Sequence, residues 1–241
     1  MAERFDPGAF AYAHRGLWTD AGPPENSLAA FIAAAENGLG IEFDVRPASD
    51  GVPVIFHDPV LDRMTDQTGA VESRTSTELA QISIKGGGTI PRLTDLLDVW
   101  PGTTPLLCEL KIDGATDPAQ FTRTVAAQID QHPGPAAMMS FSTEAVAAIP
   151  THIPRGQLIT PSYMSGAQDL ASTSTTTVDY LACHVSDADN PSLQESRANG
   201  RPLLAWTVKD EATCAALTTV TDSQIFEGYD PVLAKRHILN T

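Results

Sequence analysis

Short apolar runs alternate along the chain with stretches that have the spacing of amphipathic or alanine-rich helices. The runs that predict strands are Ala9–Ala13, Ile41–Val45, Pro105–Leu110, Ala136–Ser140, Gln157–Thr160, Tyr180–Cys183, Pro202–Trp206 and Gln224–Phe226. The clearest helical stretches are Ser27–Asn37, Ala119–Gln131, Ser192–Asn199 and Glu211–Val220. Strands that alternate with helices predict a parallel sheet, and eight such units predict an α/β fold of the (β/α)8, or TIM-barrel, type.

One further apolar run, Val52–His57, does not fit this alternation. It follows the second predicted strand after the turn Pro-Ala-Ser-Asp-Gly, and a parallel crossover needs a dozen or more residues. We therefore expect an excursion at the carboxyl-terminal mouth of the barrel. It leads into the polar stretch 58–91, which we expect to form a small inserted subdomain within a single barrel domain, residues 1–241.

Composition narrows the classes of partner. The 241 residues include 15 Lys and Arg against 30 Asp and Glu, which gives a formal charge of −15. The chain is 42% hydrophobic with a mean hydropathy of −0.10, so it can bury a proper core. A chain this poor in basic residues is not expected to bind nucleic acid or an anionic membrane surface. The composition leaves the oligomeric state open.

Three features predict a cytoplasmic protein. The start, Met1–Pro7, has neither the basic nor the apolar part of a secretory signal. No window approaches the 18 or more apolar residues of a membrane span. The cysteines Cys108, Cys183 and Cys214 are far apart and form no C-x-x-C pair, which is typical of buried free thiols in a reducing compartment.

Acidic residues recur with a period of two in the predicted strands. Glu42, Asp44 and Arg46 share one face of the second strand, and Glu109 and Lys111 share one face of the third. Carboxylates about 6.6 Å apart along a strand can converge on one cation. Oxygen ligands of this kind suit Mg²⁺ or Ca²⁺ better than zinc. The alternative is a structural network of ion pairs that lines the barrel.

Two histidines close predicted elements beside these acids. His14 ends the first strand in His-Arg-Gly, and His57 ends the excursion in His-Asp-Pro. Either alone is typical of a structural histidine, but together they favour an acid–base pair because imidazole titrates near neutrality. His184 ends another predicted strand and could also face the pocket. The remaining histidines, His132, His152 and His237, are not predicted to lie at a strand end that faces the pocket.

Several short motifs follow one another in a fixed order along the chain. They are Ala13-His14-Arg15-Gly16, Pro24-Glu25-Asn26-Ser27, Glu42-Phe43-Asp44-Val45, His57-Asp58-Pro59-Val60-Leu61-Asp62-Arg63, Ile90-Pro91-Arg92-Leu93, Glu109-Leu110-Lys111, Ser140-Phe141 and Trp206-Thr207. Their order resembles that of the glycerophosphodiester phosphodiesterases, and the resemblance runs from about residue 9 to about residue 230. A single His-Arg-Gly would carry little weight, whereas the ordered set is specific.

The resemblance implies a barrel enzyme that hydrolyses a glycerophosphodiester to glycerol 3-phosphate and an alcohol. It implies that His14 and His57 are the acid–base pair, that Glu42, Asp44 and Glu109 hold one divalent cation, Mg²⁺ or Ca²⁺, and that Arg15 and Lys111 contact the phosphate. Glu25 would support the site from behind these residues. Trp206 resembles the aromatic residue that family members have at the mouth of the barrel, against which the organic part of the substrate packs. The alternative is that Trp206 only packs in the rim or the core.

The resemblance is weakest toward the carboxyl terminus. The family usually ends its last strand in Thr-Asp or Thr-Asn before Pro, whereas this chain has Glu227-Gly228-Tyr229-Asp230-Pro231. The stretch Pro150–Asp179 also matches only loosely. Because the histidines and carboxylates lie outside both segments, the implied chemistry is unaffected.

Other functions explain the residues less well. A glycoside hydrolase leaves the two histidines and Lys111 unexplained. A non-catalytic barrel that only binds phosphorylated ligands would be expected to lack a histidine or a ligand. A lysophospholipase D is the nearest alternative, but the absence of an apolar or basic membrane-binding segment favours small, soluble diesters.

The sequence also limits the nucleophile. It has no G-x-S-x-G motif, and Cys108 should point away from Glu109 and Lys111, so the attacking oxygen belongs to water or to a substrate hydroxyl. Arg15, Lys111 and the cation must offset the overall negative charge near the phosphate, and Arg63 could help.

Overall fold

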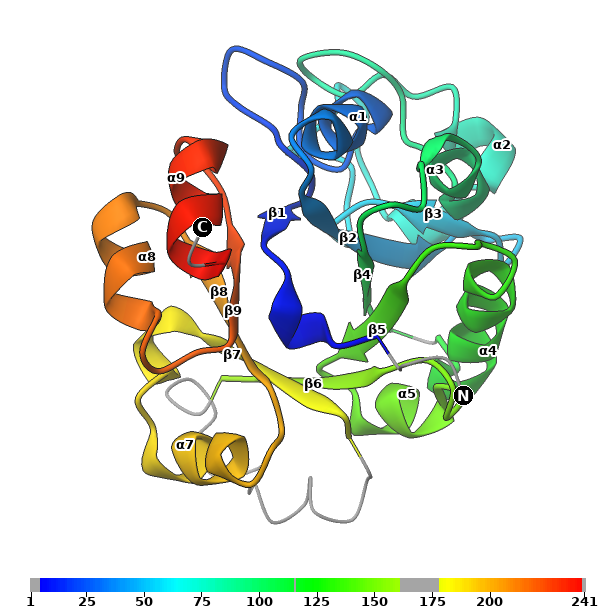
Figure 1. Ribbon diagram of the computed structural model, residues 1–241. Helices are drawn as coiled ribbons and strands as arrows, with labels where there is room; N and C mark the ends of the chain where they lie inside the picture. Colours follow the sequence, from blue (N-terminus) through cyan, green and yellow to red (C-terminus); the bar gives the residue numbers. More distant parts are fainter. Residues whose placement is uncertain (1–4, 115, 161–177, 240–241) are drawn as a thin grey trace.

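The computed structural model describes residues 5–114, 116–160 and 178–239, and its strands confirm the predicted barrel. Eight parallel strands follow one another in the order β1-β2-β4-β5-β6-β7-β8-β9, and β9 pairs with β1 to close the ring. They are β1 Tyr12–His14, β2 Gly40–Pro47, β4 Leu106–Leu110, β5 Ala136–Ser140, β6 Arg155–Ile159, β7 Tyr180–His184, β8 Leu203–Val208 and β9 Ser223–Phe226. In Figure 1 the blue first strand lies beside the orange-red last strand.

Helices surround this ring (Figure 1). They are α1 Leu28–Glu36, α3 Leu93–Val99, α4 Pro118–Ile129, α5 Thr143–Ala148, α7 Pro191–Ala198, α8 Glu211–Leu217 and α9 Pro231–Leu239, with short 3-10 turns η1 Pro7–Ala9 and η3 Val185–Asp187. Side chains cap the first turns of α1, α4, α5, α7 and α8, as when the Ser27 hydroxyl accepts from the Ala30 amide of α1 at 3.2 Å. The four stretches predicted to be helical are confirmed, with ends shifted by up to three residues.

The excursion after β2 forms an extra strand, β3 Pro53–Ile55, which runs antiparallel to β2 with Val45 opposite Ile55. β2 is longer than β1 and β4. The first residues of β2 pair with β1, and its last residues pair with β3. The chain then passes through η2 Val71–Ser73 and α2 Ser76–Leu79. Apolar side chains of this region make their own cluster, which contains Ala48, Val54, Phe56, Leu61, Val71, Leu79, Ile82, Ile84 and Ile90.

Alternation along the strands separates two apolar layers. One faces the helices and includes Ile41, Phe43 and Cys108. The other fills the inside of the barrel and contains Tyr12, Leu107, Ala137, Met139, Leu158, Tyr180, Ala182, Leu204 and Ile225. Cys108 therefore points away from Glu109 and Lys111, as expected. The packed interior closes the barrel below its carboxyl-terminal mouth, so a cavity inside the barrel must lie above this layer.

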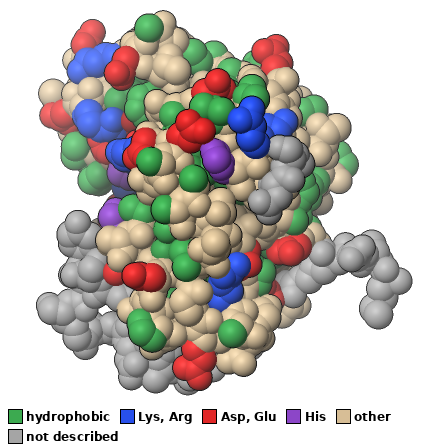
Figure 2. Space-filling model, turned by 60° about the vertical axis from the view of Figure 1, so that its left-hand side comes forward, with side chains coloured by type: hydrophobic (Ala, Val, Ile, Leu, Met, Phe, Trp, Pro, Cys, Tyr) green, Lys and Arg blue, Asp and Glu red, His purple; other side chains and the backbone are tan. Residues whose placement is uncertain are grey.

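The surface mixes charges of both signs. On the face shown in Figure 2, acidic and basic side chains are interspersed among polar and apolar ones. The large apolar side chains that are most exposed belong to different elements, with Ile32 in α1, Val99 in α3, Val232 in α9 and Val60 in the insertion. Among the described residues, no helix has both the length and the apolar character needed to cross a bilayer.

Candidate active site

Strand register brings the predicted site residues together at the carboxyl-terminal mouth. His14 lies opposite Glu42 across the β1–β2 pair, and Asp44 lies opposite Glu109 across the β2–β4 pair. Because side chains alternate along each strand, these four point to the inside of the barrel together with Lys111. Residues about 100 positions apart in the sequence thus surround one point.

Three buried carboxylates lie at the centre. One oxygen from each of Glu42, Asp44 and Glu109 lies within 4.8 Å of the other two, and none of the three residues is more than 7% exposed. Burial and the charges of Asp44 and Glu109 raise the pKa of Glu42 well above its usual value, and burial also raises the pKa of Glu109. Glu42 Oε1 is buried without a hydrogen-bond partner among the described residues. A hard divalent cation fits this set of oxygen donors.

Two basic residues compensate Asp44 in particular. Lys111 Nζ lies 3.0 Å from Asp44 Oδ1 and 2.6 Å from Glu109 Oε1, and Arg15 Nε lies 3.4 Å from Asp44 Oδ2. Burial alone would raise the pKa of Asp44, but Lys111 and Arg15 outweigh it and hold that pKa far below its usual value. The cluster therefore contains one well-compensated carboxylate, Asp44, and one poorly compensated carboxylate, Glu42.

Each candidate acid–base histidine has a carboxylate on its Nδ1. His14 Nδ1 lies 2.5 Å from Glu227 Oε2, and His57 Nδ1 lies 2.7 Å from Asp58 Oδ1. His14 Nε2 lies 3.9 Å from Glu42 Oε2. Burial lowers the pKa of both histidines, and their carboxylate partners only partly offset it. Both rings are thus held in place with a neutral form favoured.

These residues line one cavity of about 210 Å³. Its polar wall is formed by His14, Arg15, Glu42, His57, Glu109 and Lys111, and its apolar wall by Met139, Phe141, Leu158, Trp206 and Ile225. The Trp206 ring packs edge-on against Phe141 at a centroid distance of 5.8 Å and against His184 at 5.4 Å. His184 contacts Trp206 but does not itself line the cavity. The cavity can therefore hold an anionic group on one side and an organic group on the other.

Glu25 and Arg63 lie behind the polar wall. Glu25 Oε1 accepts from Arg15 Nη1 at 2.9 Å and from Arg63 Nη2 at 2.7 Å, and Arg63 Nε also donates to Asp58 Oδ2 at 2.6 Å. Glu25 thus holds the Arg15 guanidinium from behind the polar wall. The suggested help of Arg63 at the phosphate is not supported, because its guanidinium binds two carboxylates and does not line the cavity.

Three further residues, to which the sequence patterns gave no site role, hold the site in place. Asn26 Nδ2 donates to Asp44 Oδ2 at 2.8 Å, and Arg46 donates to the His57 carbonyl oxygen from Nε at 2.8 Å and from Nη2 at 2.6 Å. Glu227 is the third, through His14. The place of Glu227 could have been predicted from barrel closure, because the residue after Phe226 must lie beside the end of β1.

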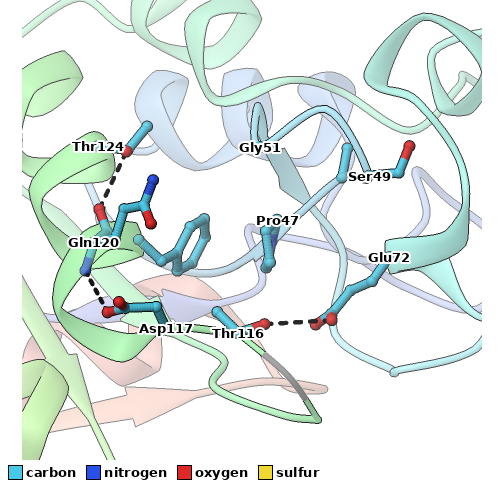
Figure 3. A pocket seen from close by; sticks show the side chains of 10 residues that line it. Pro47, Ser49, Gly51, Glu72, Thr116, Asp117, Gln120 and Thr124 are labelled. Carbon is cyan, nitrogen blue, oxygen red and sulfur yellow. Dashed lines mark hydrogen bonds between the residues drawn. The ribbon is translucent and has the colours of Figure 1, made fainter.

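A second cavity, of about 300 Å³, lies outside the barrel between the end of β2 and the start of α4 (Figure 3). In Figure 3 Thr116 and Glu72 point toward one another and share a hydrogen bond of 3.3 Å. The ionisable residues of its described lining are the acids Glu72 and Asp117. Because a phosphodiester is negatively charged and both ionisable residues of this lining are acids, this cavity does not suit a phosphodiester.

Comparison with known proteins agrees with the site. The family model described as the glycerophosphoryl diester phosphodiesterase family matches residues 14–226. The chain belongs to this family. The match begins at His14 and ends at the last residue of β9, so it contains every candidate residue that lines the polar wall.

Individual members of the family match over different lengths. Glycerophosphodiester phosphodiesterase 1 of Homo sapiens is 46% identical over 74 residues, which cover 30% of this chain and only 22% of the human protein. A putative glycerophosphodiester phosphodiesterase of Bacillus subtilis is 26% identical over 239 residues, or 94% of this chain and 97% of that protein. The structure of an Oleispira antarctica phosphodiesterase in complex with the product sn-glycerol-3-phosphate is similar with a TM-score of 0.82 at 26% identity, covering 95% and 96% of the two chains.

Proposed function

We propose that this protein hydrolyses glycerophosphodiesters to glycerol 3-phosphate and an alcohol, with His14 and His57 as acid and base. The observation that supports this most is the shared cavity, which both histidines, two of the three clustered carboxylates and two cationic side chains line. The product bound to the Oleispira antarctica relative is the same glycerol 3-phosphate that this reaction would release.

Glu42, Asp44 and Glu109 would hold one divalent cation, Mg²⁺ or Ca²⁺. The unpartnered Glu42 Oε1 and the mutual repulsion of the three carboxylates support this assignment. A bound cation of this kind supplies Lewis-acid polarisation of a phosphoryl oxygen. Arg15 and Lys111 would contact the remaining phosphoryl oxygens, where a charge-assisted hydrogen bond strengthens as negative charge builds up.

The apolar wall would receive the organic part of the diester. Phe141 and Trp206 hold each other edge to face, so a substrate group that enters would find a preformed aromatic surface. Small soluble diesters are the expected substrates. A lysophospholipase D remains the second candidate, and the apolar wall is the feature that could accommodate an acyl-bearing glycerol.

The attacking oxygen would be the substrate's own 2-hydroxyl. One histidine takes the hydroxyl proton, the new bond from O2 to phosphorus forms, and the bond to the alcohol breaks as the other histidine protonates it. Water then opens the cyclic phosphate, and the histidines exchange roles. Attack within one molecule avoids an entropic cost of up to about 7–11 kcal/mol. A diester whose 2-hydroxyl is replaced by hydrogen should not be turned over; turnover at the parent rate would identify water as the nucleophile.

The proposed function is tested by following a panel of glycerophosphodiesters by ³¹P NMR with purified protein and a divalent cation. We expect conversion of at least one diester to glycerol 3-phosphate. Conversion only of lysophospholipids would support the second candidate. If no diester in the panel is cleaved with either Mg²⁺ or Ca²⁺, the protein is a phosphate-binding barrel and not an enzyme of this class.

A further inference from the structure

The end of the last strand contacts the first histidine. β9 ends at Phe226, whose neighbour across the barrel closure is Ala13, so the next residues, Glu227 and His14, also come together. Glu227 Oε2 lies 2.5 Å from His14 Nδ1, and Glu227 Oε1 lies 2.9 Å from Lys209 Nζ. Only 10% of the Glu227 side chain is exposed, whereas 68% of the Lys209 side chain is. Glu227 thus connects a buried imidazole to a surface ammonium.

The second histidine has the same arrangement with different residues. His57 Nδ1 lies 2.7 Å from Asp58 Oδ1, and Asp58 Oδ2 accepts from Arg63 Nε at 2.6 Å. In both places the order is imidazole, carboxylate, cation. The carboxylate partner of His57 is its neighbour in sequence, whereas that of His14 comes from the opposite end of the chain.

The charge of Glu227 decides the direction of its hydrogen bond. Burial alone would raise the pKa of Glu227, but the hydrogen bond from His14 and the Lys209 ammonium lower it to about 2. An ionised carboxylate has no proton to donate, so His14 Nδ1 must be the donor. In the neutral ring the other nitrogen, Nε2, then carries a free lone pair, and it is the nitrogen nearer to Glu42.

We propose that Glu227 and Lys209 are positioning residues that fix the Nδ1–H tautomer of His14 and aim its Nε2 into the cavity. This inference rests on the proposed function, since it concerns how His14 is prepared for proton transfer. Glu227 acts through His14 and does not line the cavity, and Lys209 keeps Glu227 ionised and fixed in orientation.

The substitution Glu227→Gln tests the tautomer because Lys209 determines how the amide would sit. Lys209 can only donate, so the amide oxygen would face Lys209 and the amide NH₂ would face His14. His14 Nδ1 would then accept a hydrogen bond, and the proton of the neutral ring would move to Nε2. The ring would keep its place and lose the lone pair that faces the cavity.

We expect Glu227→Gln to lower kcat by about 100-fold or more with a much smaller change in KM, since a positioned acid or base contributes about 10²- to 10⁴-fold. Glu227→Asp retains the carboxylate and should lose less. Lys209→Met changes a largely exposed side chain and should lower kcat by only about 3- to 10-fold, because Glu227 still accepts from His14. Glu211→Gln is the matched control, since Glu211 lies 3.0 Å from His237 away from the cavity, and it should leave kcat unchanged.

The tautomer itself is read from ¹H–¹⁵N correlation spectra of protein with ¹⁵N-labelled histidine, assigned with the variant His14→Gln. We expect Nδ1–H for His14 in the wild type and Nε2–H in Glu227→Gln. A wild-type Nε2–H tautomer, or a Glu227→Gln variant with wild-type kcat, would overturn the inference. If the wild type cleaves no diester, the proposed function fails, and the spectra still decide whether Glu227 sets the tautomer.

Discussion

The same strands build two different levels of the barrel interior, a lower apolar level and an upper charged level at the carboxyl-terminal mouth. On β4, Leu107 belongs to the fully buried apolar level, and Glu109, two residues further on the same face, belongs to the carboxylate cluster. The lower level is filled by side chains such as Tyr12 and Tyr180 that are completely buried. The upper level contains charges and an unpartnered oxygen, Glu42 Oε1.

This difference separates stability from function. Burying apolar surface stabilises the fold, whereas burying like charges close together destabilises it unless a counter-charge is present. The lower level should therefore supply stability without touching the chemistry, and the upper level should supply chemistry at some cost in stability. A substitution in one level should therefore leave the property supplied by the other level nearly unchanged.

The largest effect is expected from Asp44→Asn in the upper level. The substitution removes a cation ligand and the partner of Lys111 and Arg15, so kcat/KM should fall by about 10³-fold, which is about 4 kcal/mol. Glycerol 3-phosphate release measures this, with Asp130→Asn, at an exposed pair with His152, as the control. An Asp44→Asn protein that works at the wild-type rate in EDTA-treated buffer would show that the metal-site assignment is wrong.

Leu204→Ala makes the converse change in the lower level. Leu204 is completely buried, so the cavity left behind should lower the free energy of unfolding by about 3 kcal/mol, measured by urea denaturation. The activity of the folded variant should stay within about threefold of the wild type. Val232→Ala, at a side chain that is 61% exposed, should change neither quantity appreciably. A normal stability together with a lost activity would contradict the division into two levels.

Lys111→Ala should have an intermediate effect on catalysis. Loss of a charge-assisted hydrogen bond to the phosphate should raise KM and lower kcat, reducing kcat/KM by about 10- to 100-fold. Steady-state kinetics separate the two constants, and Lys85→Ala, an exposed lysine in the insertion, controls for loss of a positive charge. Unchanged kcat/KM in Lys111→Ala would remove this residue from the substrate contacts.

The smallest effect is expected from Glu42→Gln on stability. Removing one of three clustered carboxylates should raise the free energy of unfolding of the metal-free protein by about 1 kcal/mol, because it relieves repulsion between buried charges. The midpoint of thermal unfolding should rise when Mg²⁺ or Ca²⁺ is added to the wild type, and much less in the variant. Glu36→Gln, on the exposed face of α1, is the control. If the metal-free Glu42→Gln protein is less stable than the wild type, the buried carboxylates of the upper level do not destabilise the fold.

Much of the fold and of this cluster could be predicted from the sequence because the relevant signals are local. Period-two alternation places Glu42 with Asp44 and Glu109 with Lys111, and the short turn before Val52 excludes another parallel strand. β3 is accordingly antiparallel to β2, and Glu42, Asp44 and Glu109 do converge.

The contacts that hold the site could not be predicted in the same way, because each depends on the path of a long side chain or on a distant pairing. Arg46 binds the His57 carbonyl, and Arg63 binds Glu25 and Asp58. Glu227 reaches His14 across 213 positions, and its departure from the family pattern concealed its place in the site.

The central claim is that the upper level uses a divalent cation to cleave a diester. The most direct measurement is the rate of glycerol 3-phosphate release by protein stripped with EDTA, as Mg²⁺ or Ca²⁺ is added back. We expect almost no release without the cation and a rate that saturates when one cation is bound per chain. Release at the full rate by the stripped protein would contradict it.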